Sequence, residues 1–253
     1  MSLINEFFRP IEPIEGISET DYKSLNHYIG SLEAISRMID LSYYIIDYKK
    51  REFLHVSNHP LFLAGYEREE VRVMGYDFFT KVVPTEDLEL LFEINEKGFN
   101  FYYNLPPERR LKGFISYDFR IKNKNNSLIL INHKLTPLIL NNEGNLWISL
   151  CLVTLSTTKK PGNMYILMQD EKVKYNYNFR TKKFLPAKSK QLSQIENNVI
   201  QYLSLGNSTK DISLILSISE NTVKFHKKNI YRKLDVRNSN EAVYLATMQK
   251  SEK

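Results

Sequence analysis

The last sixty residues of the chain contain four helix start signals, and this pattern restricts the fold more than any other feature of the sequence. Each signal is a Ser or Asn side chain that can accept a hydrogen bond from the first helical turn, and three carry an acidic residue three positions later. Apolar residues at helical spacing follow each signal. The signals are Ser193-Gln-Ile-Glu196, Ser208-Thr-Lys-Asp211, Ser219 and Asn238-Ser-Asn-Glu241. The sequence therefore predicts an all-α domain of four short helices at this end.

Only residues 217–219 separate the second predicted helix from the third, and so short a connection is typical of a helix-turn-helix. The third helix is predicted to end at Leu234, and no acidic residue lies between Asn221 and that end. Lysine can pair with phosphate oxygens or guanine edges, and asparagine can read adenine. The outward face combines such residues: Asn221, Lys224, Phe225, Lys228 and Arg232. This face is equipped to enter the major groove of DNA.

The charge is distributed unevenly along the 253 residues, whose formal net charge is +6. Residues 1–157 hold 17 Lys and Arg against 21 Asp and Glu, whereas residues 158–253 hold 18 against 8. A basic C-terminal part behind an acidic front part predicts that only the C-terminal part meets a polyanion. A solvated, lysine-rich surface would give the same imbalance, so charge alone does not decide between the two interpretations.

The stretch from Gly206 to Asn238 closely resembles the DNA-binding domain of the LuxR/FixJ (GerE-like) family, whose pattern is roughly GxSNKEIAxxLxISxxTVKxHxxNIxxKLxV. The residues in register are Gly206, Ser208, Lys210, Ile212, Leu216, Ile218, Ser219, Thr222, Val223, Lys224, His226, Asn229, Ile230, Lys233, Leu234 and Val236. The resemblance covers about residues 188–251. It implies a transcription regulator that binds double-stranded DNA as a homodimer, with RNA polymerase as a further candidate partner.

The same resemblance assigns the DNA contacts to the start of the second helix and to the third helix. The DNA-binding candidates are Lys210, Asn221, Thr222, Lys224, Phe225, His226, Lys227, Lys228 and Arg232. Lys224, Phe225 and Lys228 are expected at bases, and Lys210 and His226 near phosphates. For His226, packing between helices is an equal alternative.

Three positions depart from the family pattern. Ile195 and Asn198 stand where Arg and Glu are usual, and Ser239 stands where Arg is frequent. The first two departures affect the opening helix and predict altered packing of the domain. Phe225 is bulkier than the usual Val or Ile and can contact a thymine methyl, which predicts an unusual operator.

The front half alternates between strands and helices. Helices are predicted over residues 18–40 and 87–99, and a hairpin is predicted from the β-rich runs 42–48 and 51–57. Three longer strands follow the second helix, at residues 114–122, 127–140 and 146–156. Two strands, then helices, then three strands predict an α+β domain with a five-stranded antiparallel sheet.

Two motifs in this half resemble the PAS family. LAGYEREEV, residues 63–71, is like the family's turn and short helix, and VVPTEDLELLF, residues 82–92, is like its "hPeD" element, with Val83 in place of the usual His. The resemblance covers about residues 25–158 and implies a sensory and dimerising domain. It names no ligand.

The aromatic residues of the front half are expected to form its core, with a small-molecule cavity lined by some of them as the alternative. They are Phe62, Phe78, Phe79, Phe92, Phe99, Phe101, Tyr102 and Tyr103.

These observations divide the chain into four parts. We expect an N-terminal arm (1–24), a PAS-like sensor and dimerisation domain (25–158), a linker with a β-hairpin (159–187) and a LuxR-type helix-turn-helix domain (188–253). The linker is inferred from the composition of residues 156–163 and 179–191. The hairpin is inferred from two β-rich runs, 165–169 and 172–178, that flank Asp170 and Glu171.

Metal and redox sites find little support. The single cysteine, Cys151, excludes an internal disulfide framework and a four-cysteine metal site, and we expect it to be buried in its strand. His55 and His59 lie in a strand-to-turn context rather than on one helix face, and His133 is expected at a strand surface. We therefore expect no metal and no cofactor.

Catalysis finds no support either. The sequence has no GxSxG, Walker, HExxH or dinucleotide-binding motif, so no enzyme activity is expected. The acidic group Glu67, Glu69 and Glu70 is expected on an exposed short helix. No apolar run reaches membrane-spanning length and no signal peptide is visible, which predicts a cytoplasmic protein without a membrane partner.

Two alternatives to a ligand-sensing regulator stay open. The front domain can be a protein-interaction or dimerisation module without a ligand, which a well-packed core without a cavity would favour. The chain can also be an enzyme with a DNA-binding tail, which a cleft with converging acidic and basic groups would favour.

Overall fold

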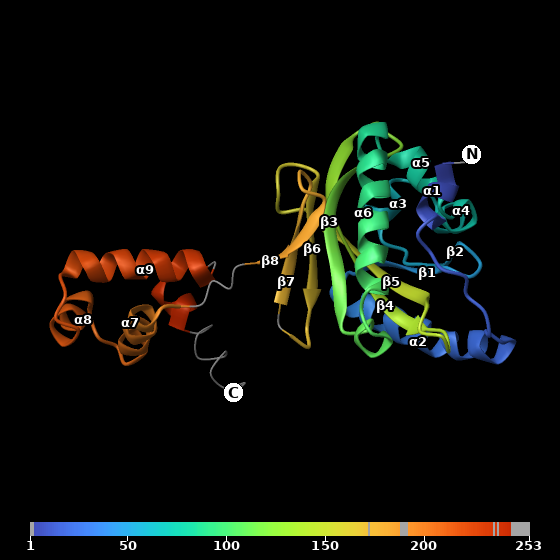
Figure 1. Ribbon diagram of the computed structural model, residues 1–253. Helices are drawn as coiled ribbons and strands as arrows, with labels where there is room; N and C mark the ends of the chain where they lie inside the picture. The colour runs from blue at the N-terminus through green and yellow to red at the C-terminus, as the bar shows by residue number, and fades with distance from the viewer. Residues whose placement is uncertain (1–2, 172, 188–191, 235, 237, 244–253) are drawn as a thin grey trace. The chain divides into compact units, whose positions relative to one another are not determined.

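The computed structural model describes residues 3–171, 173–187, 192–234, 236 and 238–243. It divides the chain into two compact units, residues 1–187 and residues 188–253, which are described separately here (Figure 1). None of the described helices is long and apolar enough to cross a membrane.

The front unit contains the predicted helices and strands within a few residues of their expected limits. Its elements are α1 (Leu3–Phe8), α2 (Glu19–Ile39), β1 (Ser42–Asp47), β2 (Glu52–Val56), α3 (Pro60–Leu63), α4 (Arg68–Met74), α5 (Asp77–Val82), α6 (Thr85–Tyr103), the 3-10 helix η1 (Pro107–Arg109), β3 (Gly113–Lys122), β4 (Leu128–Leu140), β5 (Leu146–Leu155), β6 (Gly162–Met168), β7 (Val173–Asn178) and β8 (Lys183–Pro186).

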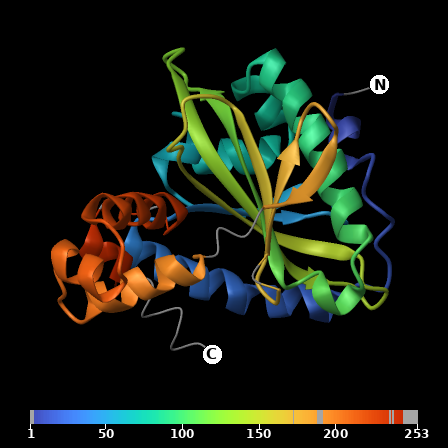
Figure 2. The ribbon, with the colours of Figure 1, turned by 60° about the vertical axis from the view of Figure 1, so that its left-hand side comes forward.

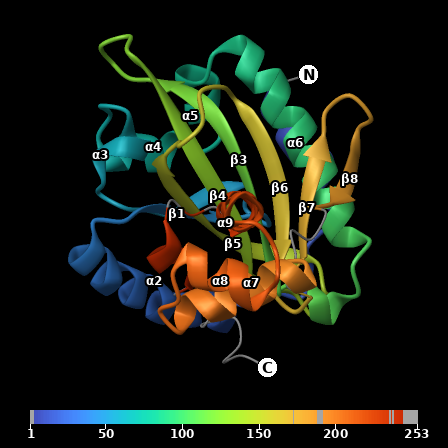
Figure 3. The same cartoon turned by 90° about the vertical axis from the view of Figure 1, so that its left-hand side faces the viewer.

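The strands form one antiparallel sheet in the order β2-β1-β5-β4-β3-β6-β7-β8 (Figure 3). The part from β2 to β3 is the predicted five-stranded antiparallel sheet, and the predicted α+β architecture is confirmed. Figure 2 shows how its long strands twist. The sheet continues through three further strands, so it has eight strands in the described residues rather than five.

The three added strands correct the expectation of a linker over residues 159–187. The predicted hairpin is present as β6 and β7, but it pairs with β3 and belongs to the sheet. The buried carboxylate of Asp118 on β3 fixes the approach to β6, because it accepts hydrogen bonds from Thr158 Oγ1 (2.9 Å) and Asn163 Nδ2 (3.1 Å). Lysines on the exposed side of edge strands give such a segment a linker-like composition.

Alternation along β1 places helices on both faces of the sheet. Tyr44 and Ile46 belong to the main core, which also includes Leu91 of α6. Ile45, between them, packs on the other face with Leu25 of α2. Because successive strand residues point to opposite faces, α6 and α2 cover opposite sides of the sheet.

The "hPeD" motif docks the start of α6 onto β3. Asp87 is buried, and its carboxylate accepts hydrogen bonds from the Arg120 backbone N (2.7 Å), Nε (3.0 Å) and Nη2 (2.6 Å). Glu86 beside it is exposed and pairs with the same guanidinium at 2.6 Å. The motif therefore fixes the position of the helix on the sheet.

The C-terminal unit consists of α7 (Gln194–Ser204), α8 (Thr209–Ile215), α9 (Glu220–Leu234) and a helical segment at residues 239–243. The four predicted caps are present: the Ser193 and Ser208 capping boxes, Ser219 Oγ accepting from Thr222 N, and Asn238 Oδ1 accepting from Glu241 N. Its core consists of Val199, Ile200, Ile212, Val223, Ile230 and Ala242. Leu245, Ala246 and Met248, expected in the fourth helix, lie outside the described residues.

Candidate nucleic-acid interface

The turn between α8 and α9 sets the angle of a helix-turn-helix. Ser217 adopts the left-handed conformation with φ of 53°, which ends α8. The Ile218 backbone N then donates to the Ser213 carbonyl at 3.0 Å, and Ser219 caps α9. Ile212 of α8 and Val223 of α9 are fully buried together, so the two helices are held by a common core.

The outward face of α9 carries the five predicted residues. Val223 and Ile230 are fully buried, whereas the side chains on the other side of the helix are exposed. Phe225 is 59% exposed, which is high for an aromatic ring and leaves it available to a partner. The exposed residues are Asn221, Lys224, Phe225, Lys228 and Arg232.

The remaining candidates flank this face. Thr222, His226 and Lys227 are half-buried, and the Thr222 hydroxyl lies 2.8 Å from Ser219 Oγ. The His226 ring packs edge-on against Phe225, and its buried Nδ1 has no hydrogen-bond partner among the described residues. Lys210 is exposed in the first turn of α8. DNA contact by each of these residues stays a prediction.

A buried ion pair that the sequence did not reveal ties α7 to α9. Lys233 Nζ donates to Glu196 Oε2 at 2.6 Å, and only 4% of the Glu196 side chain is exposed. Burial raises the pKa of Glu196, but the Lys233 ammonium and the Ser193 hydrogen bonds outweigh it and hold that pKa below its usual value. The capping box showed the helix-capping role of Glu196 but not its long-range partner.

The core of the front unit contains a small cavity of about 30 Å³. Its polar lining consists of Tyr44, Tyr48, Tyr76, Asn95, Tyr117 and His133. Burial raises the pKa of all four tyrosines well above the usual value, so their hydroxyls stay protonated. None of the described residues that line this cavity carries a charged side chain.

His133 corrects the expectation of a surface histidine. Its residue is 1% exposed, and its Nε2 shares a 2.6 Å hydrogen bond with the Tyr44 hydroxyl. Burial lowers the pKa of His133 to about 3, so the ring is neutral at ordinary pH. Cys151 is fully buried as predicted, and burial raises the pKa of its thiol.

The other groups considered in the sequence have structural partners. His59 caps α3, Glu69 pairs with Arg72, and Glu70 pairs with Lys124 at 3.2 Å. The described residues contain no group of three or more His, Cys, Asp or Glu that could hold a metal ion.

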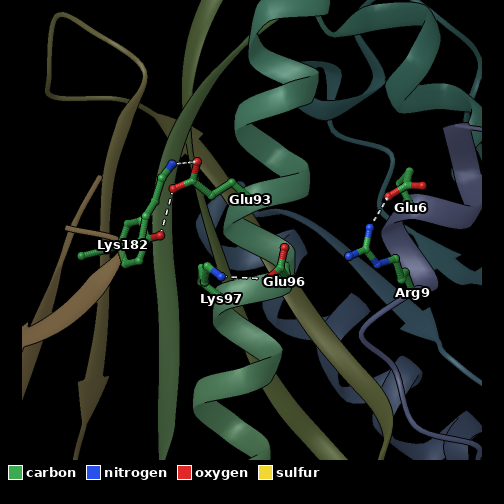
Figure 4. Close-up of polar contacts among 7 residues, drawn as sticks. Glu6, Arg9, Glu93, Glu96, Lys97 and Lys182 are labelled. Carbon is green, nitrogen blue, oxygen red and sulfur yellow. Dashed lines mark hydrogen bonds and ion pairs between the residues drawn. The ribbon is translucent and has the colours of Figure 1, made fainter. Parts of the chain in front are cut away.

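A surface cleft of about 310 Å³ lies between α1, α6 and the turn after β7. Charges of both signs line it, and each has a partner close to itself in the structure (Figure 4). Glu6 pairs with Arg9, Glu96 with Lys97, and Glu93 with Lys182. Such self-neutralised pairs do not form a converging acid and base for catalysis.

The sequence profile of the family described as "Bacterial regulatory proteins, luxR family" matches residues 190–246. These residues include α7, α8 and α9 with their caps and shared core. The C-terminal unit is a LuxR-type helix-turn-helix domain.

The similarity to known regulators extends beyond the LuxR-type domain, and its extent differs from one relative to the next. The transcriptional activator protein EchR of Dickeya chrysanthemi is 33% identical over 94 residues, which cover 36% of this chain and 38% of EchR. The transcriptional activator protein ExpR of Pectobacterium parmentieri is 26% identical over 230 residues, which cover 84% of this chain and 86% of ExpR. The chain therefore spans well under half of EchR but most of ExpR.

Among solved structures, the VqmA dimer of Vibrio cholerae aligns with 85% of this chain and 86% of its own chain, at 13% sequence identity and a TM-score of 0.34.

Proposed function

We propose that the chain is a sequence-specific DNA-binding transcription regulator in which α9 of the LuxR-type domain reads the major groove. The observation that carries this proposal is the exposed face of α9, which has one amide, one aromatic ring and three cations, with no acidic residue between Asn221 and Leu234. Helix α8 would cross the phosphate backbone, as the first helix of such a motif does. The curated relatives EchR and ExpR, both named as transcriptional activators, support this assignment.

In vitro selection tests the proposal directly. The full chain is incubated with random duplex DNA, bound molecules are sequenced, and affinity for the selected duplex is measured over a salt series. We expect a shared motif with two-fold or repeated half-sites, and a linear fall of log affinity with log salt. A pool without a common motif, or no binding at low salt, would refute sequence-specific recognition.

The regulator would act as a homodimer. Three apolar side chains near the end of α2 support this idea: Ile35 is 40% exposed, Met38 78% and Ile39 61%. Exposed apolar groups of this kind mark association surfaces. Sedimentation of the full chain measures its mass in solution, and a monomer at the concentrations where DNA is bound would contradict the dimer.

The front unit would sense a small uncharged molecule in its core cavity and change the affinity of the dimer for DNA. The neutral hydroxyls and the neutral imidazole that line the cavity support an uncharged ligand. A ligand found by melting-temperature screening should alter DNA binding by the full chain but not by residues 188–253 alone. If the ligand changes DNA binding equally for the full chain and for residues 188–253, the front unit does not sense it.

One observation favours the second candidate, an interaction module without a ligand. The cavity of about 30 Å³ is far below the roughly 300–1,000 Å³ of ordinary ligand sites. In that case no small molecule raises the melting temperature of the front unit, whereas removing residues 1–187 still abolishes dimerisation. For both candidate functions, we propose that the protein has no enzymatic activity and acts in the cytoplasm.

A further inference from the structure

The first helix, α1, inserts aromatic side chains into the core of the front unit. Phe7 is 5% exposed and Phe8 is 3% exposed, although they lie only a few residues from the start of the chain. The Phe7 ring lies 4.8 Å from the ring of Phe92 and 5.7 Å from that of Phe79. Figure 1 shows α1 beside α5, which carries Phe79, and α6, which carries Phe92.

Only one of the two phenylalanines lines the core cavity. Phe7 forms part of its wall together with Tyr44, Tyr76 and His133, whereas Phe8 packs against Tyr76 and under the Arg51 guanidinium. The cavity therefore ends where the Phe7 ring begins. Without that ring, the cavity would extend into the space that the Phe7 side chain now fills.

Among the described residues, few polar contacts hold α1 in place. The Asn95 side-chain amide donates to the Phe7 carbonyl, and Arg9, just after the helix, pairs with Glu6 of the same segment. The cleft of about 310 Å³ separates this segment from the charged side of α6. None of the ion pairs between described residues at this cleft joins α1 to α6 (Figure 4).

The chain directly after α1 is anchored much more firmly. The Glu12 backbone N donates to the Tyr103 hydroxyl at 3.2 Å, and Asn145 Nδ2 donates to the Pro13 carbonyl at 3.1 Å. Asn141 Nδ2 donates to the Glu15 carbonyl at 3.3 Å. A movement of α1 would thus pivot near residues 9–11 and leave the rest of the arm in place. A helix of six residues has little stability of its own, so α1 stays ordered only while it is docked.

We propose that α1 is a tethered plug, and that a small, uncharged molecule with a single ring displaces Phe7 to occupy the enlarged core cavity. The ring replaces the aromatic contacts of Phe7, and one hydrogen-bonding group meets the neutral hydroxyls or the His133 imidazole. This inference rests on the proposed sensing function, since it supplies the space that a cavity of about 30 Å³ lacks. It also explains why a well-packed core and a ligand site can coexist in one unit.

The test uses the full chain with Phe7→Ala and phenol as the probe. Removal of the ring enlarges the cavity toward the roughly 150 Å³ that holds one benzene ring. The apparent affinity of the unmodified chain is reduced by the small fraction of molecules in which Phe7 is displaced. Calorimetry should therefore show phenol binding to Phe7→Ala at least about tenfold tighter than to the unmodified chain. Benzoate, which carries a charge into a neutral cavity, should not bind to the variant.

Phe8→Ala is the matched control, because Phe8 is equally buried but does not line the cavity. It should lower the melting temperature similarly without gaining phenol affinity. Equal gains for the two variants, or no gain for a folded Phe7→Ala chain, would overturn the plug.

A second measurement covers the case in which Phe7→Ala fails to fold. Saturating phenol added to the unmodified chain should accelerate hydrogen exchange in residues 3–9 and leave residues 12–17 unchanged. Exchange that stays the same in residues 3–9 while phenol binds would refute displacement of α1. Binding of phenol without any change in DNA affinity would leave the plug in place and instead count against the sensing function.

Discussion

Glu196 in the first turn of α7 accepts a 2.6 Å hydrogen bond from Lys233 in the last turn of α9. The two residues lie 37 positions apart, and the Glu196 side chain is almost completely buried. This pair fixes the end of α9 against the opening helix of the LuxR-type domain. The family's usual Arg and Glu are absent here at Ile195 and Asn198, and this pair connects the opening helix to α9.

Replacing Glu196 with Gln should destabilise the C-terminal unit by about 1–3 kcal/mol, because a neutral amide replaces the buried carboxylate that pairs with the Lys233 ammonium. Since the pKa of Glu196 is lowered on folding, this stabilisation is present above the unfolded value of 4.5 and is lost as the pH falls below it. Urea unfolding of residues 188–253 at pH 7 and pH 3.5 measures both effects. The exposed Glu220 provides the control, since Glu220→Gln should change stability by a few tenths of a kcal/mol. A variant as stable as the unmodified unit at pH 7 would show that the pair contributes nothing.

The residues on α9 and α8 should differ in how they affect specificity. Lys224→Ala or Lys228→Ala should cost roughly 1–3 kcal/mol on the selected operator and little on scrambled DNA, because both residues face the groove. Lys210→Ala should weaken binding to both duplexes equally and reduce the salt slope by about one, because the start of α8 meets only phosphate. Binding of the three variants to both duplexes over a salt series gives the comparison. If Lys224→Ala and Lys228→Ala lose affinity equally for both duplexes, the two lysines do not read bases. Specificity would then have to come from Asn221, Phe225 or DNA shape.

Two adjacent carboxylates on one guanidinium should contribute unequally to the front unit. Asp87→Ala should cost about 3 kcal/mol, because Arg120 and its backbone N lose a buried acceptor. Glu86→Ala should cost less than about 1 kcal/mol, because that carboxylate is 70% exposed and screened by water. Urea unfolding followed by Trp147 fluorescence reports on the front unit. Equal losses would mean that the "hPeD" aspartate has no special role in docking α6.

The helices and the central strands were predictable because their signals are local. Capping boxes, the short connection at residues 217–219 and the alternation in the strands each lie within a few residues, and the structure reproduces them. The exposed face of α9 followed from helical spacing in the same way.

The linker was mispredicted because strand pairing across the chain is not local. By composition alone, residues 162–186 resemble a connecting segment. In the fold, Asp118 on β3 accepts hydrogen bonds from Thr158 and Asn163, and these contacts hold β6 beside β3. The burial of Phe7 and His133 was hidden for the same reason. Both side chains are buried by contacts with residues far away in the sequence.

Cys151 should be unreactive in the folded chain. Its thiol is fully buried, and burial raises its pKa, so almost no thiolate reaches solvent. A coloured thiol reagent at pH 8 should label the protein slowly in buffer and within seconds in urea. Leu25→Ala removes a buried side chain from the other face of the sheet. Faster labelling of Cys151 in this variant would show that the thiol is reached by unfolding of the whole front unit. Rapid labelling of the unmodified chain without denaturant would contradict the burial of Cys151. A sensing role for this thiol would then have to be considered.

His133 should make the front unit sensitive to acid. Its pKa is about 3 in the folded chain against 6.5 in the unfolded chain, so between these values the unfolded state binds more protons. The free energy of unfolding should therefore fall as the pH decreases from 6.5, by up to about 1.4 kcal/mol for each pH unit. His133→Gln removes this group and should flatten the dependence between pH 6.5 and pH 4, although His55, whose pKa is also lowered by burial, retains a part of it. His27→Gln at an exposed position of α2 is the control for the effect of the substitution itself. An unchanged slope for His133→Gln would mean that the imidazole reaches solvent, and the neutral lining of the core cavity would no longer hold.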